Sequence, residues 1–171
     1  MSVSRKTKEI EASVDQLVDA LDITGVDKRT TLVLGGGALA FAGIRPAHDL
    51  DMMIPGEEFE RMEQTGQTPS GLSVVRKKEA VQHPFLRLYP AANKPYILPT
   101  DITFPYGENF LRDPKRDREF TETIANFNEV GGYRFLPPRM VAEHKMSMER
   151  PRFKDRRDVR TIGRFLGHQH S

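Results

Sequence analysis

The chain has 171 residues, contains no cysteine and carries a formal net charge of +2. An apolar fraction of 37% supports one folded domain over residues 1–171, and the lack of cysteine excludes disulfide frameworks, thiolate zinc sites and cysteine nucleophiles. The sequence has no apolar run of membrane-spanning length and no signal-peptide pattern. We therefore expect a cytoplasmic protein that does not contact a membrane.

The charges are distributed unevenly along the chain. Residues 111–171 carry 14 Lys/Arg against 9 Asp/Glu, whereas residues 1–110 carry 12 against 15. This asymmetry fits an acidic site that faces a basic surface, and it equally fits ordinary solvated helix faces. Charge alone does not choose between the two interpretations.

Periodicity in the first part of the chain predicts three helices, the first of them amphipathic, together with a short apolar strand and a strand that carries two aspartates. Apolar residues at helical spacing, β-branched runs and strict alternation are the signals. They predict helices over 5–22, 38–43 and 57–64 and strands over 31–35 and 48–54.

The second part predicts more strands followed by two helices. Strands are expected over 72–76, 85–89 and 96–104, then a strand pair within 118–136 around a Gly-Gly turn, and helices from Pro137 to about Met148 and over 153–166. This order predicts an α+β fold with a mixed β-sheet flanked by helices. The sheet core is expected at about 30–136 and a C-terminal helical segment at 137–166.

The residues with the strongest chemical signal lie between 34 and 54. Gly35, Gly36 and Gly37 follow a strand and precede a helix, so backbone amides there can approach a phosphate. Asp49 and Asp51 occupy alternate positions of the next strand and therefore project from the same face. Two carboxylates so close together favour a bound cation, and oxygen ligands favour Mg²⁺ or Mn²⁺.

A third carboxylate belongs to the same predicted site. Asp101 is flanked by apolar residues in a later strand, which we expect to lie beside the strand of Asp49 and Asp51. There it could bind a second metal ion and accept the proton of an attacking hydroxyl. Asp49, Asp51 and Asp101 are thus the predicted catalytic and metal-binding residues.

These motifs resemble the nucleotidyltransferase-fold (DNA polymerase β-like) superfamily. The segment GGGALAFAGIRPAHDLDMMI is similar to AbiEii-like abortive-infection toxins and small antibiotic nucleotidyltransferases, which share a Gly-Gly-Ser/Thr-Ala-Leu start, an Arg before the Asp-x-Asp pair and a downstream Lys-Asp-x-x-Asp helix. Arg45 matches that Arg, Lys154-Asp155-x-x-Asp158 matches the helix motif, and Lys145 lies one helix earlier. The chain departs from the pattern at Gly37, where many relatives carry Ser or Thr.

The resemblance implies Mg²⁺-dependent transfer of an NMP from an NTP, such as ATP, to an acceptor hydroxyl. It implies that Gly35–Gly37, Arg45, Lys145 and Lys154 bind the nucleotide. Toxin-like relatives imply tRNA or another RNA as acceptor, together with a cognate antitoxin, and the nine Lys/Arg of residues 139–164 suit RNA. Antibiotic-modifying relatives imply an aminoglycoside or lincosamide instead. A nucleotide-binding regulatory module without turnover is a further alternative.

Two of these residues also have purely structural interpretations. Arg45 either binds a triphosphate or forms a salt bridge with Asp49. Lys154 either lies at the nucleotide or forms a surface ion pair with Asp158, four residues later.

Overall fold

A computed structural model describes residues 11–77, 84–89, 98–148 and 151–168 of the chain. Over these residues the fold is α+β, with six α-helices, two short 3-10 helices and seven strands in one mixed sheet. The predicted α+β class with a mixed sheet and C-terminal helices is therefore confirmed. No helix among the described residues has the length and apolar character needed to cross a membrane.

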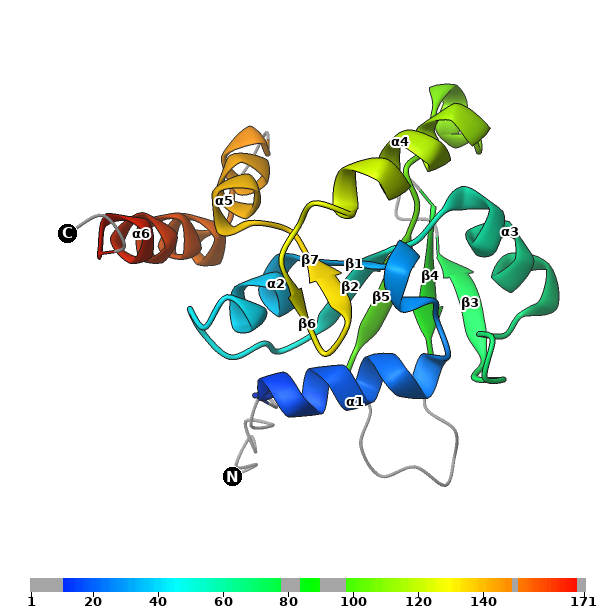
Figure 1. The fold of residues 1–171 in the computed structure, drawn as a ribbon, viewed down its shortest axis with the longest axis horizontal. Helices are drawn as coiled ribbons and strands as arrows, with labels where there is room; N and C mark the ends of the chain where they lie inside the picture. The colour runs from blue at the N-terminus through cyan, green and yellow to red at the C-terminus, as the bar shows by residue number, and fades with distance from the viewer. Residues whose placement is uncertain (1–10, 78–83, 90–97, 149–150, 169–171) are drawn as a thin grey trace, which may run out of the picture.

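The seven strands follow the order β3-β4-β5-β2-β1-β7-β6 across the sheet (Figure 1). The pairs β2 with β5 and β1 with β7 are parallel, and the other pairs are antiparallel. The strands are β1 (Leu32–Leu34), β2 (Leu50–Met53), β3 (Val74–Lys77), β4 (Phe85–Leu88), β5 (Thr100–Thr103), β6 (Glu129–Val130) and β7 (Tyr133–Phe135). The first five confirm the predicted strands in shorter form, and residues 96–97 of the last prediction lie outside the described residues.

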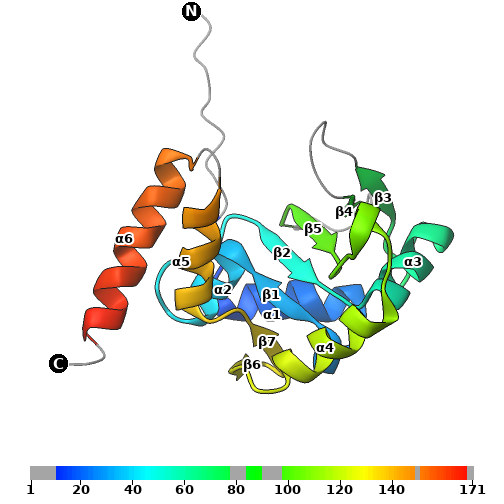
Figure 2. The same cartoon turned by 90° about the horizontal axis from the view of Figure 1, so that it is seen from above.

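Four of the helices lie in two groups at opposite ends of this sheet (Figures 1 and 2). Helices α5 and α6 run side by side at one end, with α6 outermost, whereas α3 and α4 lie at the other end. The elements are α1 (Val14–Thr24), η1 (Lys28–Thr30), α2 (Gly35–Phe41), α3 (Gly56–Thr65), η2 (Glu108–Phe110), α4 (Pro114–Ile124), α5 (Pro138–Ser147) and α6 (Phe153–His168).

The start of α1 differs from the prediction of a helix over 5–22. Ser13 caps the helix through a reciprocal capping box with Gln16, and before it Ala12 forms an isolated bridge with Ala47. The extended segment that contains Ala12 therefore ends at Ser13, where the helix begins. Residues 5–10 of the predicted helix lie outside the described residues.

The segment 118–136 contains a helix that the sequence interpretation missed. Only 129–130 and 133–135 form the predicted strand pair, whereas residues before Ala125 belong to α4. Asp113 caps α4, Pro114 occupies its first turn, and Phe120 and Ile124 are buried at helical spacing. These start signals lie before residue 118, outside the window that was interpreted as strands.

The core connects the sheet with the C-terminal helices. Leu17, Leu39, Met52 and Ile102 are fully buried, and Ile162 of α6 is 1% exposed in the same cluster. Burial of such side chains stabilises each by roughly 1.5–3 kcal/mol. Helix α6 is therefore packed onto the domain and is not a separate appendage.

Candidate functional site

Two neighbouring strands place Asp51 and Asp101 side by side. Strands β2 and β5 pair in parallel, and Asp51 is the register partner of Asp101. Both strands alternate buried and partly buried positions, so that Leu50, Met52 and Ile102 enter the core while the two aspartates share the other face. The predicted neighbourhood of these strands is thus confirmed.

Asp49 precedes the strand on which it was predicted. Strand β2 begins at Leu50, and Asp49 lies in the bend before it. The prediction of a regular strand from residue 48 is therefore wrong at its first two residues, because Pro46 and the Ala12–Ala47 bridge shape the chain there. The Asp49 charge nevertheless acts on Asp51, as its effect on the Asp51 pKa shows.

The glycine turn lies directly against the carboxylates. Leu34, the last residue of β1, is the register partner of Asp51, and Gly35 then turns the chain with a φ of +52°, a value that glycine adopts without strain. A methyl group on Gly35 would lie 3.3 Å from Asp51 Oδ2, and one on Gly36 would lie 3.6 Å from Asp49 Oδ1. The methyl group on Gly36 would lie closer still to the Arg45 guanidinium, at 3.3 and 3.4 Å, so side chains at these positions would fill the space between the turn, Arg45 and the carboxylates.

Gly37 belongs to the core and does not share this face. A methyl group at Gly37 would lie 2.8 Å from Val33 Cγ1 and 3.5 Å from Leu50 Cδ1, and the residue is buried. A serine or threonine here would collide with a β-branched core side chain. A glycine at position 37 therefore has a packing reason. The helix also begins at Gly35, not after the glycines as predicted.

The acidic site is electrostatically unfavourable when all its carboxyls are ionised. Burial raises the pKa of Asp51 to about 7, the negative charges of Asp49 and Asp101 add to the rise, and Lys145 and Lys154 oppose it. An added cation at this site would relieve the repulsion. The two lysines therefore contribute positive potential at Asp51, as expected of residues near the site.

Arg87 is a site residue that the sequence interpretation missed. It lies on β4 as the register partner of Asp101, and its Nε and Nη2 donate to Asp101 Oδ1 and Oδ2 at 3.0 and 3.3 Å. The alternating pattern of residues 85–89 predicted the strand, but not which strand would lie beside it. In the part of the chain that the structure describes, no three His, Cys, Asp or Glu side chains are arranged to hold a metal ion as they stand.

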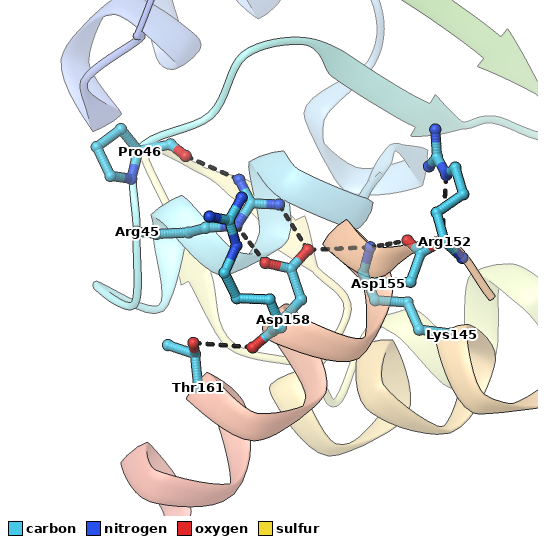
Figure 3. Close-up of polar contacts among 8 residues, drawn as sticks. Arg45, Pro46, Lys145, Arg152, Asp155, Asp158 and Thr161 are labelled. Atoms are coloured by element: carbon cyan, nitrogen blue, oxygen red, sulfur yellow. Dashed lines mark hydrogen bonds and ion pairs between the residues drawn. The ribbon is translucent and has the colours of Figure 1, made fainter.

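A buried charge network joins α5 and α6 to the loop that leads into β2 (Figure 3). Arg45 donates from Nε and Nη2 to the two oxygens of Asp158, at 2.7 and 2.8 Å, and from Nη1 to the Pro46 carbonyl oxygen. Lys145 Nζ lies 3.0 Å from Asp155 and 3.1 Å from Asp158. The carboxylates of Asp155 and Asp158 are 1% and 4% exposed, so the network is part of the interior.

The ion pairs in this network differ from the two that the sequence suggested, Arg45 with Asp49 and Lys154 with Asp158. Arg45 pairs with Asp158 and not with Asp49, and among the described residues Asp158 pairs with Arg45 and Lys145 and not with Lys154. Although burial opposes ionisation, hydrogen bonds from Lys145 and Arg152 lower the Asp155 pKa to about 2. Hydrogen bonds from Arg45 and Lys145 likewise outweigh burial and lower the pKa of Asp158. Both aspartates are thus held ionised.

One open hollow of about 400 Å³ lies away from the predicted site residues, between η2 and the start of α4. It is lined by residues such as Gly107, Leu111 and Arg116 and includes none of the predicted aspartates or glycines. Its chemistry gives no reason to move the candidate site there.

No protein-family model, curated protein or solved structure matches the chain.

Proposed function

We propose that this protein is a metal-dependent nucleotidyltransferase that moves an NMP from an NTP to an acceptor hydroxyl: the hydroxyl oxygen bonds to the α-phosphorus, the bond to the β-phosphate breaks, and pyrophosphate leaves. One observation carries the proposal: Asp51 and Asp101 share one face of neighbouring parallel strands, and the Gly35–Gly36 turn lies against the carboxylates of Asp51 and Asp49. A turn without side chains leaves room for phosphate groups beside acidic ligands.

The chemistry of the three carboxylates suits Mg²⁺ or Mn²⁺, although their side chains would have to converge further to hold the ion. The space that a glycine methyl group would fill lies 3.3 Å from Asp51 Oδ2, and the pKa of Asp51 is raised first by burial and then by the charges of Asp49 and Asp101. Asp49, Asp51 and Asp101 would hold the cation, because hard divalent ions prefer carboxylate oxygens. When bound, such a cation would supply charge neutralisation at the triphosphate.

The chain's own residues would then position the substrates and move one proton. The Asp101 carboxylate would accept the proton of the acceptor hydroxyl, and the backbone of Gly35 and Gly36 would allow the β- and γ-phosphates to approach closely. Lys145 and Lys154 would add positive potential near the negative phosphates, as they do at Asp51. Arg45 would mainly hold the loop before Asp49 through its bond to Asp158.

The proposal is tested by transfer of labelled nucleotide. Each of the four NTPs, labelled on the α-phosphate, would be incubated with the full chain, Mg²⁺ and either total tRNA or a panel of aminoglycosides and lincosamides. We expect Asp49→Asn and Asp51→Asn to lower the transfer rate about 100-fold or more, because each removes a charged ligand. Asp19→Asn, an exposed change in α1, is the matched control. Equal rates in Asp51→Asn and the control would refute the mechanism.

The outer face of α6 supports RNA as the acceptor. The acidic residues of α6, Asp155 and Asp158, are buried, whereas four of its arginines are exposed: Arg156, Arg157, Arg160 and Arg164. Phe153, at the start of the helix, is 76% exposed. Arginines that contact phosphates beside an exposed aromatic ring on which a base can stack are typical of single-strand binding surfaces.

Matched double variants test the RNA acceptor separately from nucleotide chemistry. Arg157→Gln/Arg160→Gln should weaken tRNA binding about tenfold at low salt, since each lost phosphate contact lowers affinity and the salt dependence. Lys115→Gln/Arg118→Gln removes the same charge from the exposed face of α4 and should have little effect. Equal losses in the two variants would remove the argument for α6 and favour a small-molecule acceptor.

A further inference from the structure

Arg87 forms an ion pair with Asp101, the carboxylate that is proposed to bind metal and accept a proton. Its guanidinium donates to both oxygens of Asp101 in a side-by-side, two-bond arrangement. An ionised carboxylate engaged in this way offers its best-placed lone pairs to the arginine. A divalent cation and Arg87 therefore compete for Asp101.

The ion pair between Arg87 and Asp101 is partly exposed to water, and this lowers the cost of exchanging one partner for another. The side chains of Arg87 and Asp101 are 42% and 34% exposed, and water screens ion pairs of this kind. The Arg87 guanidinium carbon also lies 5.5 Å from the centre of the Phe85 ring, two residues earlier on β4. Contact with this ring can keep the guanidinium near the site after it leaves Asp101.

Phosphate is a natural second partner for this side chain. Arginine binds phosphate with the same two-bond geometry that it uses for a carboxylate. The Gly35–Gly36 turn, where the triphosphate is proposed to bind, faces Asp51, the register neighbour of Asp101. Substrate phosphates bound at the turn would thus lie near Asp51 and Asp101, the carboxylates beside Arg87.

We propose that Arg87 blocks Asp101 against divalent cations until a triphosphate arrives, and then transfers its guanidinium from Asp101 to the substrate phosphates. The inference rests on the proposed function, because it takes Asp101 as a metal ligand. It assigns Arg87 as a positioning residue that makes cation and triphosphate bind cooperatively. By linkage, each ligand must then strengthen the binding of the other by the same factor.

Calorimetric titration of the full chain with Mn²⁺, with and without inorganic tripolyphosphate, tests this. We expect Arg87→Gln to tighten Mn²⁺ binding about tenfold in the absence of tripolyphosphate, to weaken tripolyphosphate binding about tenfold, and to reduce the coupling between them to near one. Arg87→Lys should fall between, since lysine keeps the charge and loses the two-bond geometry.

The control is a pair of nearly identical exposure on the next strand. Arg76 of β3 lies 2.9 Å from Glu63, with side chains 41% and 33% exposed, and Arg76→Gln should leave all three quantities unchanged. If wild type binds Mn²⁺ through Asp51 but Arg87→Gln behaves as wild type, the inference on Arg87 fails and the proposed function stands. If Asp51→Asn leaves Mn²⁺ binding unchanged, the proposed metal site itself fails.

Discussion

Two arginine–aspartate pairs with the same two-bond geometry occupy very different surroundings in this protein. In Arg45–Asp158 the side chains are 20% and 4% exposed, whereas in Arg87–Asp101 they are 42% and 34% exposed. Breaking a buried pair leaves an uncompensated charge in the interior and costs about 3–5 kcal/mol, but an exposed pair contributes only about 0–1 kcal/mol. Burial therefore separates a pair that holds the fold together from a pair that can exchange partners.

The largest difference in stability between the two pairs is expected when Asp158 is removed. We expect Asp158→Ala to lower the free energy of unfolding by about 3–5 kcal/mol, because Arg45 and Lys145 would lose a shared partner in the interior. Chemical denaturation with Asp101→Ala as the matched variant measures the difference. A loss for Asp158→Ala no larger than that for Asp101→Ala would contradict the distinction between the pairs.

Acid should weaken the buried network in a defined range. The Asp155 pKa is lowered from 3.8 to about 2, so its ionised form stabilises the fold above pH 4, and this stabilisation is lost as the pH falls through about 2. The contribution is about 2 kcal/mol, and denaturation curves between pH 5 and pH 2 should show it. Asp155→Asn should flatten this part of the profile. An unchanged slope in the variant would show that Asp155 does not carry it.

The acidic site should show the opposite pH dependence. The raised pKa of Asp51 means that the folded chain binds more protons than the unfolded chain between pH 4 and about 7, so stability falls as the pH rises through this range. At pH 8 without metal, Asp51→Asn should therefore be about 1–2 kcal/mol more stable than wild type, and the gain should disappear near pH 4. Thermal melts at both pH values measure it, and a variant less stable than wild type at pH 8 would contradict the account.

Arg87 should matter least for stability. Arg87→Gln is expected to change the free energy of unfolding by less than about 0.5 kcal/mol, because its partner remains solvated. Denaturation in low and high salt checks this, with Arg76→Gln as the control of equal exposure. A loss of unfolding free energy above about 2 kcal/mol would show that Arg87 stabilises the fold, and would contradict its proposed transfer from Asp101 to phosphate.

Local patterns in the sequence predict the elements that carry the acidic residues, but not all of their partners. Alternation around Asp51 and around Asp101 predicts two strands, and three glycines predict the turn beside them. By contrast, the contact of Arg87 with Asp101 depends on strand order, and the contacts of Asp158 with Arg45 and Lys145 join residues from three elements. Such long-range contacts leave no periodic signal in one sequence.

The boundaries of α4 and of the glycine turn also depend on residues or contacts outside the local pattern. Helix α4 was missed where its start signals, Asp113 and Pro114, lie outside the window taken as strands. Three consecutive glycines look equivalent in sequence, whereas a methyl group on Gly37, unlike one on Gly35 or Gly36, would lie 2.8 Å from Val33 Cγ1. Only the packing of the turn on β1 distinguishes the three positions.

The central claim, that these carboxylates bind a divalent cation, is tested most directly by paramagnetic broadening. Mn²⁺ added with tripolyphosphate to the ¹⁵N-labelled chain should broaden the amide signals around Asp49, Asp51 and Asp101 and those of Gly35 and Gly36 first, and should spare β6 and the exposed face of α1. Broadening that begins at the acidic surface of α1, or that is the same in Asp51→Asn, would contradict the claim.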